Sequence, residues 1–342
     1  MTGLPRNTIL IGDARSRLAE LPPESVDCVI TSPPYFAARD YGQREQIGHE
    51  PDIQRWVEEL RIVLAGVARV LKPTGALWLN LGDGYARHSS EGALTKSLLL
   101  APERVALALS ADGWTLRNKV IWSKTNPMPS SVRDRLTCTY EVVYFITRTP
   151  RYYFNLDAIR EPLRSTKPQG ASAPVRSYPP RGAGAPLRAG SLANENHGLS
   201  RLKAAGIAGH PKGKNPGDVW RLATASFHGQ HFATFPLSLI ERPLLATCPK
   251  TICRACGQPV DIVPCTCGTT DTRPGVVLDP FFGAGTVGLA AEQHGRDWLG
   301  VELSPTYAAL ADQRLASART AHATNTRKEV PHGSGTTTRT TR

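Results

Sequence analysis

The sequence predicts an α/β protein built on an open sheet, and three features support this fold class. An apolar run at 26–30 indicates a buried strand, which Pro33 and Pro34 stop because neither can donate a backbone hydrogen bond. A second apolar run, at 276–278, leads into a glycine turn and a helix. A third run ends at Glu302. In such sheets ligands bind at the carboxyl ends of the strands, where all three runs place polar residues.

Residues 31–35, Thr-Ser-Pro-Pro-Tyr, form a rigid corner after the first of these strands. The corner combines a hydroxyl, two proline carbonyls and an aromatic ring. The Tyr35 ring suits stacking on a flat base, and the Ser32 hydroxyl and Pro33 carbonyl can accept the hydrogens of an exocyclic amine. The alternative interpretation is an ordinary Pro-Pro strand stop followed by a surface tyrosine.

Residues 279–286, Asp-Pro-Phe-Phe-Gly-Ala-Gly-Thr, have the composition of a nucleotide-binding turn. Gly283 and Gly285 let the backbone approach a ligand closely, and the helix that follows offers free N–H groups. Glu302 follows Asp279 at about the 20-residue offset at which a carboxylate reaches the ribose hydroxyls of a nucleoside. A plain strand–glycine–helix turn is the alternative, and the two flanking acids favour the nucleoside site.

The order TSPPY at 31–35, DPFFGAGT at 279–286 and GVEL at 300–303 resembles the permuted beta class of amino-group DNA methyltransferases, which use S-adenosylmethionine. The resemblance implies a Rossmann-like S-adenosylmethionine-dependent methyltransferase sheet with circularly permuted motif order. It implies that the catalytic residues are Ser32, Pro33, Pro34 and Tyr35. It implies cofactor contacts by Asp13, Thr31, Phe235, Pro236, Asp279, Phe281, Gly283, Gly285, Thr286 and Glu302.

Other stretches resemble further segments of the same family. Residues 7–13 resemble its N-terminal strand, whose aspartate, here Asp13, lies beside the adenine of the cofactor; a turn or capping role is the alternative. Residues 122–127 and 140–145 resemble the segments that follow the catalytic strand. Residues 231–236 resemble the segment that contacts the methionine end of the cofactor.

The 342-residue chain can bury a sizeable core, as one large domain or as one domain with an insert. Its net charge of +12 suits a polyanionic partner. No signal-peptide pattern opens the sequence, and no apolar run approaches the roughly 18 residues of a membrane span. We therefore expect a cytoplasmic protein with no membrane partner.

Periodic patterns predict the remaining elements of the fold. Apolar spacing over 53–71 predicts a helix that faces the core, with Trp56 assigned to packing. Further helices are expected over 14–25, 98–111, 235–246 and 304–318. Further strands are expected over 7–13, 76–83, 120–122 and 141–148, the last of them antiparallel and at the end of the sheet.

Two segments of unusual composition interrupt this pattern. The polar loop 36–52 either closes over a substrate or is an ordinary surface loop.

Between 151 and 230 basic residues outnumber acidic ones, and Pro and Gly are frequent. This region is either a solvated, partly disordered loop or a DNA-engaging insert that grips phosphates and orders on binding. Members of the family carry target recognition here, so we favour the insert.

The resemblance covers residues 7–162 and 215–318 and divides the chain into parts. The expected parts are a catalytic half (1–162), a basic, partly flexible target-recognition insert (163–214), a return segment to the core (215–247), a cysteine insert (248–272), a cofactor-binding half (273–318) and a disordered basic tail (319–342).

Five of the seven cysteines fall within 248–267, which favours a reduced protein with a metal-type cluster over a disulfide scaffold. Four thiolates on two tight turns can complete a tetrahedral zinc site, so we expect a structural zinc at Cys253, Cys256, Cys265 and Cys267. Free thiols are the alternative, and Cys248 is a competing ligand. A role for Cys265 as the nucleophile of cytosine-C5 methyltransferases is rejected, because Thr266 follows it and it lies within the cluster.

The resemblance implies methyl transfer to an exocyclic amine of a base flipped out of double-stranded DNA. In the family, Ser before Pro-Pro-Tyr is associated with cytosine N4 and Asp with adenine N6, so Ser32 favours N4-cytosine over N6-adenine. Ser32 is a poor base, and we expect the amine proton to leave to water. RNA or protein methylation and a non-catalytic DNA-binding protein remain as alternatives. A companion restriction endonuclease is expected from the family, and both a monomer and a homodimer remain open.

Overall fold

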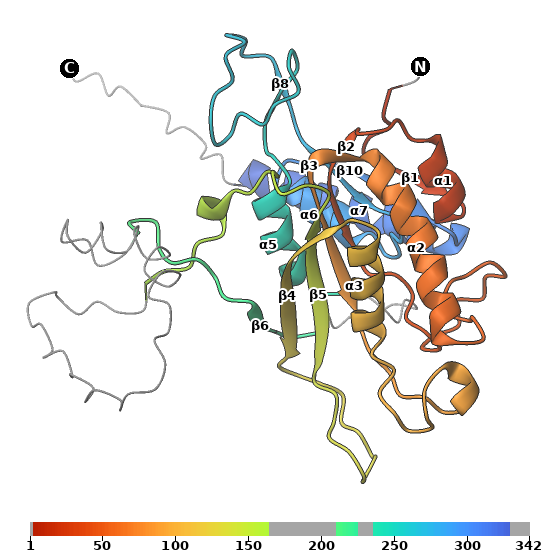
Figure 1. Ribbon diagram of the computed structural model, residues 1–342. Coiled ribbons are helices and arrows are strands. Elements are labelled where there is room, and N and C mark those ends of the chain that lie inside the picture. The colour runs from red at the N-terminus through yellow and green to blue at the C-terminus, as the bar shows by residue number, and fades with distance from the viewer. Residues whose placement is uncertain (1–2, 164–209, 225–234, 329–342) are drawn as a thin grey trace, which may run out of the picture. The chain divides into compact units, whose positions relative to one another are not determined.

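Figure 1 shows the computed structural model, which describes residues 3–163, 210–224 and 235–328. The chain divides into two compact units, residues 1–155 with 218–342 and residues 156–217. None of the helices in the described ranges is long and apolar enough to cross a membrane.

The larger unit is built on an eight-stranded sheet in the order β1-β10-β9-β2-β3-β5-β4-β6. In that order the strands span Thr8–Ile11, Asp297–Glu302, Val276–Asp279, Val26–Thr31, Leu71–Leu81, Tyr140–Thr147, Thr115–Lys124 and Val219–Leu222. The first five are mutually parallel, β5 is antiparallel to both neighbours, and β6 is parallel to β4. Because β2 and β9 are neighbours, the corner and the glycine loop leave the sheet side by side.

Helices cover both faces of this sheet and confirm the predicted α/β class. On one face pack α1 (Ala14–Glu20), α2 (Ile53–Val70) and α3 (Ala101–Ala111), preceded by the short 3-10 helix η1 (Ser89–Glu91). On the other pack α5 (Leu237–Thr247), α6 (Thr286–Gln293) and α7 (Pro305–Lys328). The alternation along β3 explains the two layers, since Leu77 and Leu79 join the first core while Ala76 and Trp78 join the second.

The helix predicted over 53–71 shows how local sequence sets one of these elements. Asp52 caps α2 by accepting a hydrogen bond from the Arg55 N–H at 2.9 Å. Ile53, Trp56 and Leu60 then recur on one face and are fully buried against the sheet. The helix ends at Val70, where the chain turns directly into β3.

Two expectations about element positions were wrong. The strand predicted at the end of the sheet, β5, is antiparallel as expected but lies inside it, because β4 pairs along its outer edge and β6 pairs beyond β4. The helix expected to end at 318 continues to Lys328, into the segment expected to be a disordered tail. Arg319 extends the ordered region because its guanidinium pairs with Glu292 of α6, with Nε 2.9 Å from Oε2.

The smaller unit and the cysteine insert are described separately. In the smaller unit, which contains the 3-10 helix η2 (Leu156–Ala158), Asp157 accepts hydrogen bonds from Arg160 and Lys212. The cysteine insert carries a two-stranded sheet of β7 (Ile252–Cys253) and β8 (Thr272–Arg273). Most of the basic insert predicted at 163–214, the end of the tail, and residues 231–234 of the predicted methionine-end segment lie outside the described residues.

Candidate active site

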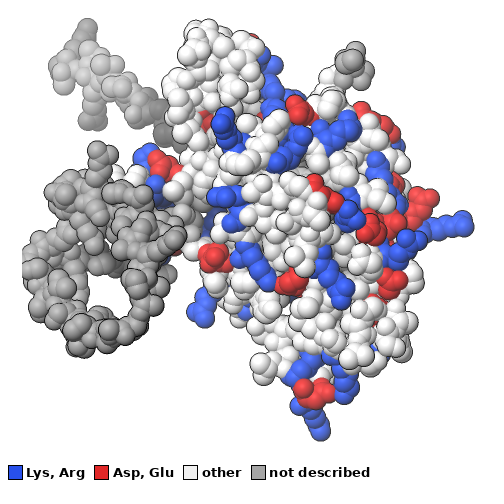
Figure 2. Space-filling view, viewed as in Figure 1, with Lys and Arg blue, Asp and Glu red and all other residues white. Residues whose placement is uncertain are grey.

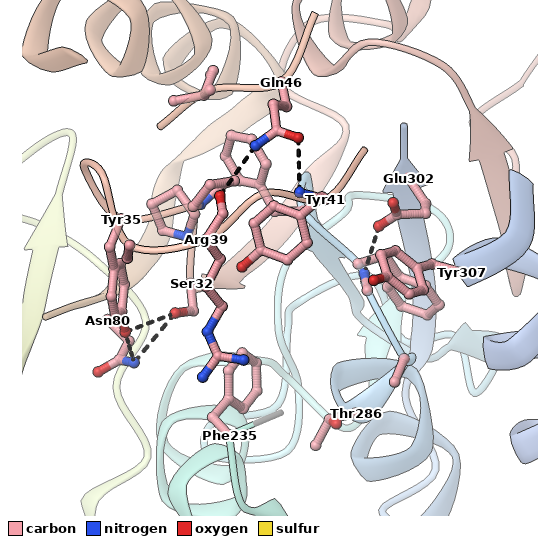
Figure 3. Close-up of a pocket in the computed structure, with 18 of the residues that line it drawn as sticks. Ser32, Tyr35, Arg39, Tyr41, Gln46, Asn80, Phe235, Thr286, Glu302 and Tyr307 are labelled. Carbon is pink, nitrogen blue, oxygen red and sulfur yellow. Dashed lines mark hydrogen bonds between the residues drawn. The ribbon is translucent and has the colours of Figure 1, made fainter. Parts of the chain in front are cut away.

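A cavity of about 800 Å³ opens where the loops after β1, β2, β9 and β10 meet. Its wall includes residues 12–14, 32–35, 280–284 and 302–304, all of which follow the carboxyl ends of parallel strands. Figure 3 shows Ser32, Tyr35 and Asn80 on one side of this cavity and Glu302 and Tyr307 on the other. The fold therefore brings the two sequence motifs to one open space, as expected for an open α/β sheet.

The corner at Ser32–Tyr35 lines the cavity, and neighbouring residues hold it in place. The Trp56 indole Nε1 donates a hydrogen bond to the Pro34 carbonyl at 3.0 Å, so this buried residue positions the corner as well as packing the core. The backbone of Gly82 lies against the Tyr35 ring, and a Cβ there would be 2.6 Å from Cε2 of the tyrosine. These contacts fix the plane of the ring, which is what stacking on a base requires.

A partly buried polar network adjoins the corner. The Tyr35 hydroxyl donates to Oε2 of Glu141 at 2.7 Å and lies 3.1 Å from the Ser32 hydroxyl. The Asn80 amide nitrogen is 2.9 Å from both the Tyr35 hydroxyl and Oε2 of Glu141, and Lys124 Nζ donates to Oε1 of Glu141 at 2.6 Å. Burial, then the Glu141 charge, raises the pKa of Tyr35 well above its usual value, so the phenol keeps its proton.

Asn80, Lys124 and Glu141 were not singled out in the sequence, although all three line the cavity. They lie on β3, β4 and β5, at the edge where the parallel strands end. Glu141 reaches that edge because β5 is antiparallel, so that the start of this strand lies beside the ends of its neighbours. A polar residue within the apolar run of β3 and an acid at the start of β5 were the available signals.

The glycine loop and the end of β10 form the other side of the cavity. Glu302 accepts hydrogen bonds from the backbone N–H of Gly283 at 2.7 Å and of Ser304 at 2.9 Å. Burial raises the pKa of Glu302, and these two bonds oppose the shift. Gly285 precedes α6 with φ of +75°, a conformation that favours glycine. The loop thus presents backbone and a carboxylate to the cavity.

The residues predicted to contact the cofactor separate into two groups. Those that line the cavity are Asp13, Phe235, Phe281, Gly283, Thr286 and Glu302. Those that lie behind its wall are Thr31, Pro236, Asp279 and Gly285.

Asp279 and Thr31 connect the two motifs below the cavity. The Thr31 hydroxyl donates to Oδ1 of Asp279 at 2.7 Å, and the same oxygen accepts the Phe281 N–H at 3.0 Å. Asp279 is 1% exposed, and burial raises its pKa to about 7. The pair therefore joins β2 to the glycine loop from inside the protein.

The turn after β1 and the loop after Tyr35 complete the wall. Asp13 caps α1 by accepting a hydrogen bond from the Arg15 N–H at 2.9 Å, as the alternative interpretation expected. Asp13 also lines the cavity. The Gln46 side chain holds the loop 36–52 by accepting the Tyr41 N–H at 2.8 Å. The Tyr41 ring meets the Tyr307 ring edge-on, with centroids 6.4 Å apart (Figure 3).

The model of the N6/N4 DNA methylase family matches residues 26–313 of this chain, and therefore most of its length. The chain belongs to this family of amino-group DNA methyltransferases. The resemblance carried by the TSPPY and DPFFGAGT motifs is thereby confirmed. The family uses S-adenosylmethionine, as expected, and the cavity offers the backbone, carboxylate and aromatic groups that a charged nucleoside requires.

Named relatives of this DNA methylase span nearly the whole chain. The type II methyltransferase M.Cfr9I of Citrobacter freundii is 33% identical over 330 residues, covering 90% of this chain and 87% of its own. The type II methyltransferase M.SmaI of Serratia marcescens is 32% identical over 333 residues, covering 91% of both chains.

Solved structures show the same fold. The cytosine-N4-specific PvuII DNA methyltransferase has a TM-score of 0.55 at 17% identity, covering 93% of each chain. A DNA modification methylase of Thermus thermophilus, solved in complex with S-adenosyl-L-methionine, has a TM-score of 0.50 at 23% identity, covering 91% of this chain and 95% of its own. The predicted Rossmann-like methyltransferase fold is confirmed.

The cysteine insert brings four of its five cysteines together. The sulfur atoms of Cys253, Cys256, Cys265 and Cys267 all lie within 4.8 Å of one another, a spacing compatible with a tetrahedral thiolate site. Cys248 does not belong to this group, because it is buried in the core among the residues that pack under α5 and α6.

Proposed function

We propose that this protein transfers a methyl group from S-adenosylmethionine to the exocyclic N4 amine of cytosine in double-stranded DNA. The observation that carries the choice of base is Ser32, the residue before Pro-Pro-Tyr, where the adenine-N6 enzymes that the sequence resembles carry Asp. Ser32 lines the cavity beside Tyr35, so it is placed to contact a base stacked on that ring.

The two sides of the cavity suggest where each reactant lies. Gly283, Thr286 and Glu302 surround the side that suits a nucleoside cofactor, with Glu302 placed at the end of β10 to accept ribose hydroxyls. Ser32 and Tyr35 surround the side that suits the base. A stacked base in a duplex cannot reach this corner, and we propose that the target cytosine is flipped into it.

The corner prepares the amine to react. Bound S-adenosylmethionine supplies a methyl group on a positively charged sulfur. The Pro34 carbonyl already accepts from Trp56, so we assign the Pro33 carbonyl and the Ser32 hydroxyl as acceptors for the two amine hydrogens. These bonds favour a more tetrahedral nitrogen and free its lone pair to attack in line. Positioning of the two reactants supplies much of the rate.

DNA is the partner that we propose from charge and from the family. Among the described residues on the face drawn in Figure 2, Lys and Arg side chains are interspersed with Asp and Glu side chains. Basic residues outnumber acidic ones in the segment 151–230, and we therefore propose this segment for the phosphate contacts. Because M.Cfr9I and M.SmaI are type II methyltransferases, we further propose that the protein acts beside a restriction endonuclease.

Identification of the methylated nucleoside tests this proposal. Mixed-sequence DNA is incubated with the protein and methyl-labelled S-adenosylmethionine, digested, and resolved by mass spectrometry. Label in N4-methylcytosine is the expected result. Label in N6-methyladenine would refute the assignment made from Ser32 while leaving the family intact, and label in 5-methylcytosine would refute the chemistry assigned to the corner.

We also propose that the four clustered cysteines hold a structural zinc ion. Cys253 and Cys256 lie on one turn and Cys265 and Cys267 on another, and the strands of this insert have only two residues each. Zinc measured at one equivalent per chain by elemental analysis, and lost in Cys256→Ser, is the expected result. Metal-free protein with four titratable thiols in this segment would show that the cluster is not a zinc site.

A further inference from the structure

The network beside the corner contains a chain of hydroxyl groups that ends at a partly buried carboxylate. Ser32 Oγ, Tyr35 Oη and Glu141 Oε2 follow one another at 3.1 and 2.7 Å. The Glu141 side chain is 14% exposed, and its second oxygen is paired with Lys124. Nothing in the transfer of a methyl group itself requires this carboxylate, so its role needs a separate explanation.

The direction of each hydrogen bond follows from Glu141, because a carboxylate can only accept. The Tyr35 hydrogen is committed to Glu141, so the Tyr35 oxygen must accept from Ser32. The Ser32 hydrogen is then directed at Tyr35. The Ser32 oxygen accepts from the Asn80 amide nitrogen at 3.3 Å and keeps one lone pair to accept from an amine. Asn80 reinforces this order, since its amide nitrogen is the atom directed at Glu141 and Tyr35.

The same order defines a path for a proton. We propose that Glu141 is the terminal acceptor of the proton that the target amine loses, and that Ser32 and Tyr35 relay it. This inference rests on the proposed function and supplies the acceptor that Ser32 alone could not be. Ser32 touches the amine and Tyr35 stacks on the base, and Glu141, Asn80 and Lys124 act through these two as positioning residues.

The step balances in atoms and charge. The bond between the amine nitrogen and the methyl carbon forms as the bond between that carbon and the sulfonium sulfur breaks. As it forms, the amine hydrogen passes to Ser32 Oγ, the Ser32 hydrogen to Tyr35 Oη, and the Tyr35 hydrogen to Glu141 Oε2. A sulfonium cation and a carboxylate anion are thereby converted into a neutral thioether and a neutral acid.

The surroundings of Glu141 suit an acceptor that must be regenerated. Lys124 from β4 donates to Oε1 at 2.6 Å, so this oxygen is occupied and Oε2 is the one that faces Tyr35. The Tyr35 phenol stays protonated because burial raises its pKa, so it serves as a relay and does not compete as the base. After the product leaves, the proton passes from Glu141, which lines the cavity, to water.

Single-turnover methyl transfer with saturating S-adenosylmethionine and DNA tests the relay. Glu141→Gln keeps the size of the side chain but cannot take the proton, and we expect the rate to fall about 100-fold or more, the usual contribution of a proton acceptor. Binding of the cofactor and of DNA should stay unchanged.

Tyr35→Phe cuts the relay in the middle while keeping the ring. If Glu141 and Tyr35 act in one path, the double variant should be no slower than the slower single variant. Glu103→Gln is the matched control, because Glu103 also pairs with a lysine of β4, Lys119, but lies outside the cavity. It should retain the wild-type rate.

The outcomes separate the relay from the proposed function. Glu141→Gln within twofold of the wild-type rate, or rate losses that multiply in the double variant, would overturn the relay while the identity of the methylated base stands. Wild-type protein that methylates adenine would overturn the choice of base. The Glu141 and Tyr35 variants would then test the relay in the same way, with adenine as the base. Wild-type protein that methylates no DNA base would overturn both.

Discussion

Replacement of Asp279 by Asn should make the protein more stable at neutral pH and change how its stability depends on pH. Asp279 is buried, and burial raises its pKa to about 7, against 3.8 for an ordinary aspartate. Between these two pH values the folded protein holds a proton that the unfolded chain has released. The contribution of Asp279 to stability therefore falls as pH rises from about 4 to about 7, and it is lowest above that range.

The size of the effect follows from the shift. About three pKa units at about 1.4 kcal/mol each give a loss of about 4 kcal/mol across the window. Asn is neutral at every pH in it, and its side-chain carbonyl can accept the two hydrogen bonds that Asp279 Oδ1 now accepts from Thr31 and Phe281. The stability of Asp279→Asn relative to wild type should therefore rise by about 4 kcal/mol between pH 4 and pH 8.

Urea unfolding of both proteins without cofactor, at several pH values across this range, measures the difference directly. Asp312→Asn, which alters an exposed aspartate on α7, is the matched control and should track the wild type at every pH. A difference between Asp279→Asn and wild type that stays flat with pH, or that favours wild type as pH rises, would refute the argument that burial controls this carboxyl group.

Three further changes test other contacts. Trp56→Phe removes the hydrogen bond to the Pro34 carbonyl, and this loss should lower the free energy of unfolding in urea by about 1 kcal/mol. The variant should also transfer methyl groups more slowly, with unchanged cofactor affinity. An unchanged rate would show that the corner does not depend on this hydrogen bond. Gly82→Ala should displace the Tyr35 ring and slow methyl transfer, with cofactor binding in calorimetry as the readout that should not change. Chelation of metal should lower the melting temperature of wild type but leave that of Cys256→Ser unmoved, and equal shifts in both would count against a structural zinc.

The parts of the site that the sequence predicts are those with local signals. Two prolines stop β2 and place Ser32 and Tyr35 at its end, and the turn at Gly283 is set by residues that adjoin it. Each of these motifs is contiguous, and each follows a strand whose apolar run is visible. The adjacency of β2 and β9 is then enough to bring the motifs together, although they lie at opposite ends of the chain.

The parts that the sequence does not predict depend on long-range pairing. Asn80, Lys124 and Glu141 come from three strands, and they meet only because β5 inserts between β3 and β4 in antiparallel orientation. Because β5 was expected at the end of the sheet, the start of this strand was not expected to lie between β3 and β4. The cofactor contact of Asp279 stays a prediction, and its motif gives no sign that its carboxyl group accepts a hydrogen bond from Thr31.

We propose that the corner at Tyr35 and the glycine loop serve one reaction, methyl transfer to an amine of a DNA base. Single-turnover transfer of label from bound S-adenosylmethionine to DNA, in wild type and in Tyr35→Ala, tests it most directly. We expect N4-methylcytosine from wild type, and from Tyr35→Ala we expect bound cofactor without transfer. Transfer at the wild-type rate by Tyr35→Ala would contradict it.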